Sequence, residues 1–327
     1  MGASFDLSTW PLWGNGLVAV GTIGLIALGA HWLVESASRL AAKLGVSELI
    51  IGLTVVALGT SAPEFAVTIL SALSGHGDIS VSNIVGSNIF NLGFILGGCA
   101  LVRAIPMDSR LLKRDGVVLG GSTLLLLVLV GADLTLGRFD GALLFGLLLV
   151  YLVFLFLQRG IGKSEAQDST ETPEGSLLQD VLIVLVSLVA IVAGSHFLVE
   201  SAVAVAKGFG VSEWAIGVTV VAAGTSAPEL AISLAGVIKG RYAISAGNII
   251  GSNIFNLLGV LGLAGMLHPV QINPVARISL IALSGLVLLA LLLMRTGWKL
   301  SRREGLILVL VAAAVWISDF SMHAMSH

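Results

Sequence analysis

The stretch GTSAPE occurs twice in this sequence, at Gly59–Glu64 and at Gly224–Glu229, each time within a long apolar run. Glu64 and Glu229 each lie about sixteen residues into their run. An ionised carboxylate at the centre of a membrane costs at least ~2.5 to 3.5 kcal/mol on insertion scales. No basic residue is placed in the sequence to pair with either glutamate. Each carboxylate therefore needs a cation, a proton or strong hydrogen-bond donors.

The composition indicates an integral membrane protein. The chain has 327 residues, of which 56% are hydrophobic and 11% charged, and its mean hydropathy is +1.02. Soluble domains carry about 25% charged residues. Apolar stretches recur near or above the ~20 residues that a helix needs to cross the hydrocarbon core. Uninterrupted runs such as LLLLVLVG (Leu124–Gly131) lack the alternation of barrel strands, which favours an all-α bundle.

The chain contains an internal duplication. An offset of 165 residues aligns Gly45–Leu101 with Gly210–Met266, and about 31 of these 57 positions are identical, more than shared hydrophobicity explains. We expect a first repeat at 1–158, with motif helices at about 48–74 and 79–101. A polar linker follows at 159–176. The second repeat is expected at 177–327, with motif helices at about 213–238 and 244–267.

The apolar runs predict about five spans in each half, and ten in all. Their expected centres are Ile26, Ala57, Asn88, Leu124, Leu148, Leu188, Ala222, Asn253, Val287 and Val311. An odd number of spans in each half inverts the second repeat in the membrane. In this layout 14 of the 17 basic residues fall on one side, and the exceptions are Arg138, Lys207 and Arg277. Because basic residues are enriched in cytoplasmic loops, we expect both termini on the extracytoplasmic side of the cell membrane.

The motif residues provide oxygen ligands. Pro63 and Pro228 each remove a backbone donor, and Gly59 and Gly224 tolerate irregular dihedrals, so we expect both helices to break at the motif and to free carbonyl groups. The spacing places four candidate oxygen ligands of each half on one helical face. They are Ala57 (through its carbonyl), Thr60, Ser61 and Glu64 in the first half, and Ala222, Thr225, Ser226 and Glu229 in the second.

A second repeated stretch adds amides and hydroxyls. SNIVGSNIFNL begins at Ser82 and GNIIGSNIFNL at Gly247, and each places three polar residues at a spacing of four on an otherwise apolar helix. These are Asn83, Ser87 and Asn91, then Asn248, Ser252 and Asn256. Such stripes also join membrane helices, so packing and ion binding both remain open. Ca²⁺ takes six to eight oxygen ligands, and the absence of His and Cys from these positions disfavours a soft-metal site.

GTSAPE followed by GSNIFNL, once in each half, resembles the paired repeats of the cation/Ca²⁺ exchanger superfamily, and most closely its prokaryotic sodium/calcium exchanger branch. The resemblance covers the whole chain. It implies ten helices and exchange of Ca²⁺ for Na⁺ by alternating access. It also implies ligands at Ala57, Thr60, Ser61, Glu64, Ser87, Asn91, Ala222, Thr225, Ser226, Glu229, Ser252 and Asn256. Some relatives have Asp where this chain has Asn256, which affects the charge of the site and the coupling stoichiometry.

Other functions fit the sequence less well. The alternatives within the same fold are exchange of Ca²⁺ for H⁺, a K⁺-dependent exchange, or exchange of another cation. A passive cation channel would also use a polar path at the midplane. An intramembrane hydrolase using Ser61 or Ser226 would need a general base, and neither half offers His or Lys at that depth.

We expect no enzymatic activity, no cofactor, no nucleic acid and no obligatory protein partner. The expected partners are Ca²⁺, Na⁺ and the lipid bilayer.

Overall fold

The computed structural model describes residues 10–75, 77–131, 134–158, 176–209, 222–272 and 274–325. The first half contains α1 (Leu12–Leu44), α2 (Glu48–Ile51), η2 (Gly52–Val56), α3 (Ala57–Thr60), α4 (Ala62–Leu73), α5 (Gly77–Phe90), η3 (Asn91–Leu96), α6 (Gly97–Val102), β1 (Ile105–Pro106), η4 (Leu111–Gly116), α7 (Val117–Gly131), β2 (Thr135–Leu136) and α8 (Arg138–Leu157). The second half contains α9 (Leu177–Gly208), α11 (Ala222–Thr225), α12 (Ala227–Ile238), α13 (Tyr242–Ile254), η8 (Phe255–Val260), α14 (Leu261–Leu267), β3 (Val270–Gln271), α15 (Pro274–Arg295), η9 (Thr296–Trp298), β4 (Lys299–Leu300) and α16 (Arg302–Met325). Residues 159–175 of the expected linker and 213–221 of the expected second motif helix lie outside the described residues.

The fold is the all-α membrane architecture that the composition predicts. Within the described residues, seven helices are long and apolar enough to cross a membrane, and an eighth span is formed if Glu48–Thr60 and Ala62–Leu73 are counted together. These two segments are bent by 50° at their junction. Ala227–Ile238 is a shorter apolar helix. Only two short two-stranded ribbons, β1–β4 and β2–β3, interrupt the helices in the described part of the chain.

Contacts between the halves are reciprocal at the offset of 165 residues. A Cβ added to Gly29 would lie 2.8 Å from Cγ1 of Ile191, and one added to Gly194 would lie 2.8 Å from Cγ1 of Ile26. β1 pairs with β4, and the corresponding strands of the other half, β3 at an offset of 165 residues and β2 at an offset of 164, pair with each other. Since Gly208 at the end of α9 packs against Leu12 at the start of α1, these two long helices run antiparallel.

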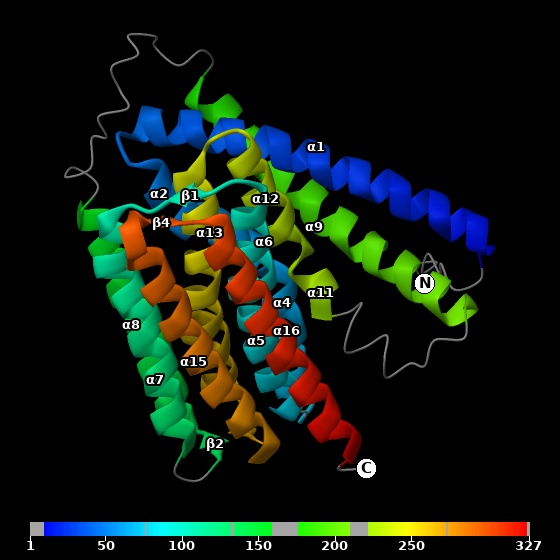
Figure 1. The fold of residues 1–327 in the computed structure, drawn as a ribbon, viewed down its shortest axis with the longest axis vertical. Helices are drawn as coiled ribbons and strands as arrows, with labels where there is room; N and C mark the ends of the chain where they lie inside the picture. Colours follow the sequence, from blue (N-terminus) through cyan, green and yellow to red (C-terminus); the bar gives the residue numbers. More distant parts are fainter. Residues whose placement is uncertain are drawn as a thin grey trace.

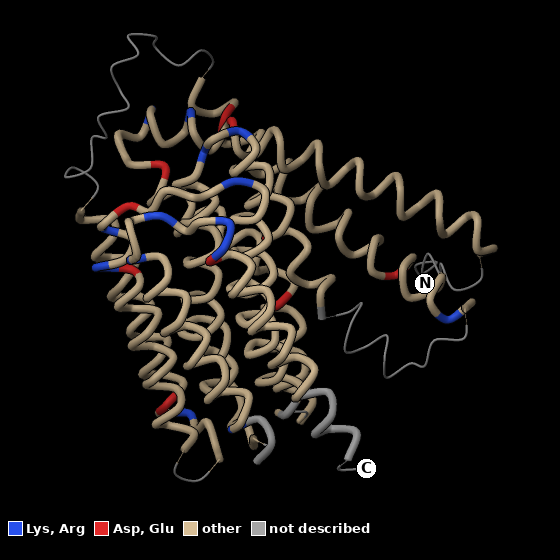
Figure 2. Tube along the Cα trace, viewed as in Figure 1, with Lys and Arg blue, Asp and Glu red and all other residues tan. Residues whose placement is uncertain are grey.

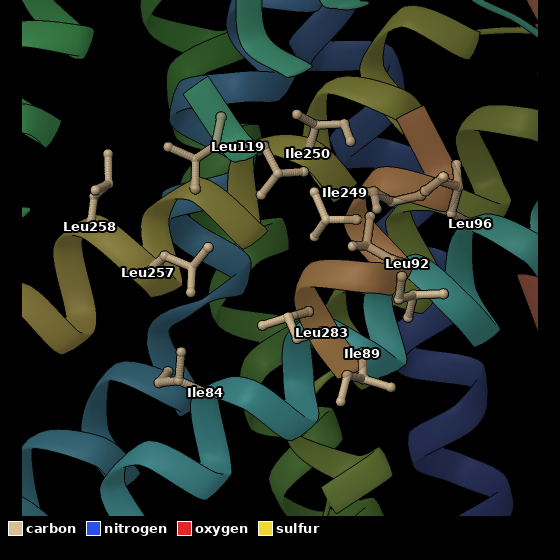
Figure 3. Close-up of a cluster of buried hydrophobic side chains, with 14 of the residues drawn as sticks. Ile84, Ile89, Leu92, Leu96, Leu119, Ile249, Ile250, Leu257, Leu258 and Leu283 are labelled. Carbon is tan, nitrogen blue, oxygen red and sulfur yellow. The ribbon is translucent and has the colours of Figure 1, made fainter. Parts of the chain in front are cut away.

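The helices form a main bundle and an oblique pair. α1 and α9 lie side by side at an angle across the other helices, as Figure 1 shows. The bundle has a large apolar core around α5, η3, α13 and η8, where Ile84, Leu92, Ile249 and Leu257 pack (Figure 3). The oblique pair has a separate, smaller core that meets the bundle through residues such as Ile232 of α12. The site described below lies between helices of the bundle, at α3, α4, α5, α12 and α13.

Most charged residues lie toward one end of the molecule, the end that holds β1 and β4 (Figure 2). Asp180 of α9 accepts hydrogen bonds from Arg39 Nε at 2.8 Å and from Lys43 Nζ at 2.5 Å, both on α1. Lys239, at the end of α12, donates to Glu35 of α1 at 2.6 Å. At that end, the Asp180 ion pairs join α1 to α9, and the Lys239–Glu35 pair joins α1 to the bundle.

Candidate cation site

Each GTSAPE helix is broken at its serine. α3 ends at Thr60 and α4 begins at Ala62, and between them Ser61 has φ −77° and ψ 8°. In the second half α11 ends at Thr225 and α12 begins at Ala227, with Ser226 at φ −90° and ψ 10°. A proline in the first turn of each new helix is tolerated there because that amide would have no intrahelical partner. The break that the prolines predict is confirmed.

The two motif glycines have a different role from the one expected. Gly59 lies within α3 and Gly224 within α11, and neither has a positive φ. A Cβ on Gly59 would approach Leu188 to 2.6 Å, and one on Gly224 would approach Val199 to 2.0 Å, both side chains of α9. The prediction that these glycines supply irregular dihedrals was wrong. They allow α9 to pack closely against both motif helices.

The break brings the two carboxylates together across the halves. Ser226 Oγ donates to Glu64 Oε1 at 3.0 Å, and Ser61 Oγ donates to Glu229 Oε1 at 3.2 Å. Both glutamates are fully buried. In the described part of the chain, the second oxygen of each carboxylate, Oε2, has no hydrogen-bond partner. Two acceptor oxygens are therefore buried and available to a ligand. Buried polar atoms without a hydrogen-bond partner are uncommon in proteins because they are destabilising.

Thr60 and the Ala57 carbonyl, two of the candidate ligands of the first half, lie at the same place. Thr60 Oγ1 is 3.2 Å from the Ala57 carbonyl, which it approaches as a donor, and 3.3 Å from Ser252 Oγ of the opposite half. Ser252 and Thr60 both lie beside the Glu229 carboxylate, and Ser87 lies beside that of Glu64. Thr60 thus faces the carboxylate of the opposite half, whereas Ser87 and Ser252 face the carboxylate of their own half from a neighbouring helix.

The structure buries most of the predicted residues. The predicted residues that are buried are Ala57, Thr60, Ser61, Glu64, Ser87, Asn91, Ser226, Glu229, Ser252 and Asn256. Thr225 is half-buried. The side chain of Ala222 lies outside the described residues, although its backbone begins α11.

Two asparagines of the second motif hold the broken helices. Asn83 Nδ2 donates to Thr68 Oγ1 at 3.0 Å and is 3.5 Å from the Glu64 carbonyl. Asn248 Nδ2 makes the matching contacts, to Ser233 Oγ at 2.9 Å and to the Glu229 carbonyl at 3.3 Å. Asn248 Oδ1 also accepts from Thr60 Oγ1 at 3.1 Å. Asn83 and Asn248 were expected on the polar stripe, and they fix the backbone of the glutamates.

Two further asparagines were missed by the sequence reasoning. Asn88 and Asn253 are fully buried at the site, and Asn256 Nδ2 donates to Asn88 Oδ1 at 3.1 Å. Both follow the serine of GSN directly, so on a helical wheel they point about 100° away from the expected stripe. The signal that could have revealed them is the repetition of the whole triplet GSN in both halves.

The donor set suits a hard cation. It consists of two carboxylates with hydroxyl, amide and carbonyl oxygens, which are the ligands that Ca²⁺ takes in proteins. Among the residues that the structure describes, no three His, Cys, Asp or Glu side chains lie close enough to hold a metal ion. The formal charge of the site therefore comes from Glu64 and Glu229, with neutral oxygens around them.

Comparison with known proteins gives consistent matches over nearly the whole chain. The profile of the family described as sodium/calcium exchanger protein matches residues 15–157 and 180–317. CaxA of Alkalimonas amylolytica, whose name calls it an antiporter, is 39% identical over 302 residues, or 88% of this chain and 93% of that one. The sodium/calcium exchanger MaX1 of Methanosarcina acetivorans is 33% identical, over 91% and 97% of the two chains. The structure is similar to that of the sodium-calcium exchanger NCX_Mj soaked with Na⁺ and Ca²⁺. Here the TM-score is 0.79 and the identity 27%, over 95% of this chain and 97% of that one.

Proposed function

Because this chain belongs to the sodium/calcium exchanger protein family and is thus a membrane transporter rather than an enzyme, we propose that it exchanges Ca²⁺ for Na⁺ by alternating access. The observation that carries the proposal is the reciprocal pairing in the buried site, where the serine of each half donates a hydrogen bond to the glutamate of the other. Each glutamate keeps one buried oxygen without a hydrogen-bond partner in the described residues. A cation bound there would neutralise carboxylates that have no basic partner among the residues that the structure describes.

The same residues account for competition between the two ions. Two carboxylates neutralise one Ca²⁺, whereas several Na⁺ ions would have to share the same oxygens, so occupation by one load excludes the other. The proposed ligands are the twelve residues expected from the sequence. Ser61 and Ser226 donate to the carboxylates in this structure, and rotation of each hydroxyl would move its hydrogen aside and offer a lone pair of its oxygen to a cation.

We infer the membrane arrangement from the same reciprocity. The antiparallel α1 and α9 and the exchanged ribbon pairs support two inverted repeats. The proposed ten spans count the helix bent at Ser61 as one span and the helix broken at Ser226 as another. The basic end of the molecule, which holds β1 and β4, would face the cytoplasm. Both termini would then lie outside the cell.

Sodium coupling is tested in proteoliposomes that contain the purified protein and internal Na⁺. We expect uptake of ⁴⁵Ca²⁺ that stops when the internal Na⁺ is replaced by choline with no pH gradient. Uptake that continues at the same rate would overturn sodium coupling. Uptake that internal Na⁺ does not drive but an acidic vesicle interior does would assign proton coupling instead. Uptake that needs K⁺ on the Ca²⁺ side in addition to internal Na⁺ would assign K⁺ dependence. Uptake with no counter-ion at all would indicate a channel.

A further inference from the structure

A chain of three hydrogen-bonding groups fixes the orientation of the Asn256 amide. Asn88 Nδ2 lies 3.4 Å from the backbone carbonyl of Asn253, and Asn256 Nδ2 lies 3.1 Å from Asn88 Oδ1. All three asparagines are fully buried. A backbone carbonyl can only accept, so this end of the chain sets the direction of the others.

The Asn253 carbonyl sets the orientation of both the Asn88 amide and the Asn256 amide. Since the Asn253 carbonyl accepts, Asn88 must turn its Nδ2 toward it and its Oδ1 toward Asn256. Asn256 must then turn its own Nδ2 toward Asn88. Its remaining polar atom, Oδ1, is buried and has no hydrogen-bond partner in the described part of the chain. The amide therefore directs its oxygen away from Asn88, and that oxygen is free to bind a cation.

The other half does not repeat this arrangement. Asn253, the counterpart of Asn88, donates Nδ2 to the Ile249 carbonyl of its own helix at 2.6 Å. Its Oδ1 and both polar atoms of Asn91, the counterpart of Asn256, have no hydrogen-bond partner within the described residues. One amide ligand is thus oriented by a neighbour, whereas the other is not.

We propose that Asn88 is a positioning residue that holds the Asn256 amide with its oxygen toward the transported cation. The inference rests on the proposed function, since it takes Asn256 as a ligand. Either oxygen of an Asp side chain can bind a cation, so Asp at this position would need no orientation. An amide presents either its oxygen or an unsuitable N–H group to the cation, so Asn256 must be oriented by a neighbour. Asn88 is therefore needed for cation binding when residue 256 is Asn, and not when it is Asp.

A double-mutant cycle tests this dependence. The half-saturating Ca²⁺ concentration and the maximal rate of ⁴⁵Ca²⁺ uptake are measured for native protein, Asn88→Ala, Asn256→Asp and the double variant. In the native background we expect Asn88→Ala to raise the half-saturating concentration about five- to tenfold, as the loss of one hydrogen bond does, with a smaller change in maximal rate. In the Asn256→Asp background the same substitution should change it at most about twofold. Asn253→Ala is the matched control and should have the smaller effect of the two asparagine variants in the native background.

An equal loss in both backgrounds would mean that Asn88 has only a structural role, and would overturn the proposal, as would an Asn88→Ala protein with native affinity. Gel filtration and thermal unfolding of each variant identify a misfolded protein. Equilibrium ⁴⁵Ca²⁺ binding in an Asn256→Ala background repeats the cycle without transport, and there Asn88→Ala should add no further loss. If the native chain neither binds nor transports Ca²⁺, the proposed function itself fails. Ca²⁺ binding without Na⁺ coupling leaves the positioning role standing.

Discussion

Replacing Glu64 by Gln removes one charge from the site and keeps the shape of the side chain. The amide oxygen of Gln can still accept the hydrogen bond that Ser226 donates to Glu64 Oε1. A bound Ca²⁺ would then face Glu229 alone and leave one uncompensated positive charge in a fully buried site. That charge costs at least about 2.5 to 3.5 kcal/mol on insertion scales. At 1.4 kcal/mol for each factor of ten, Ca²⁺ should bind about 60- to 300-fold more weakly.

The assay is the Ca²⁺ concentration that half-saturates ⁴⁵Ca²⁺ binding to the purified protein, followed by uptake into Na⁺-loaded proteoliposomes. Glu229→Gln should weaken binding to the same degree, because the two glutamates make reciprocal contacts. Glu48→Gln is the matched control, since Glu48 pairs with Arg241 at 2.9 Å and is partly exposed at the charged end. The reasoning is refuted if correctly folded Glu64→Gln and Glu229→Gln proteins bind Ca²⁺ within about threefold of the native affinity.

Three further predictions concern two asparagines of the site and one ion pair at the charged end. Asn248→Ala removes the contacts to the Glu229 carbonyl, Ser233 and Thr60, and should lower ⁴⁵Ca²⁺ affinity at least about tenfold, as two or more lost hydrogen bonds would. Native affinity would show that Asn248 is not needed to hold the backbone of Glu229 in place. Asn256→Asp should retain Ca²⁺ transport but make its initial rate more strongly pH-dependent between about pH 6 and 8, because a third buried carboxylate beside two others draws a proton; a pH profile identical to the native one would contradict this. Lys239→Ala removes the links to Glu35 and to the His31 carbonyl, and should change the ratio of inward to outward exchange rates in oriented vesicles about two- to fivefold; an unchanged ratio would show that the pair does not bias transport.

The broken helices and the buried glutamates could be predicted because their causes are local. Pro63 and Pro228 act on their own helical turn, and the position of Glu64 and Glu229 in apolar runs fixes their depth. The duplication is also visible in the sequence, and it predicted that each feature would occur twice. These statements need no knowledge of how the helices pack.

The cross-pairing of serine and glutamate depends on packing and could not be read from spacing. Ser61 lies three residues before Glu64 but donates to Glu229, which comes from the other half of the chain. Asn88 was missed for a related reason. The periodicity argument assumes one polar face, whereas α5 and α13 are largely surrounded by other helices, so a polar side chain on another face also finds buried partners. The π-helical segments η3 and η8, which begin at Asn91 and Phe255, have no signal in residue type or period.

The two halves match at the site and differ at the charged end. The pairs Ser61–Glu229 and Ser226–Glu64 exchange with each other under the offset of 165 residues, so the core contributes similar contacts to two conformations related by that exchange. The counterparts of Lys239, Asp180 and Arg39 are Ser74, Asn15 and Ala204, none of which is charged. The ion pairs of Lys239 with Glu35 and of Asp180 with Arg39 and Lys43 are therefore not reproduced by exchange of the halves. Because a ligand or contact shifts an equilibrium only by its differential free energy between two states, these pairs favour the conformation that keeps them intact. In the proposed alternating-access cycle, the duplicated centre would make the two orientations similar in free energy, and the unduplicated charges would make them unequal.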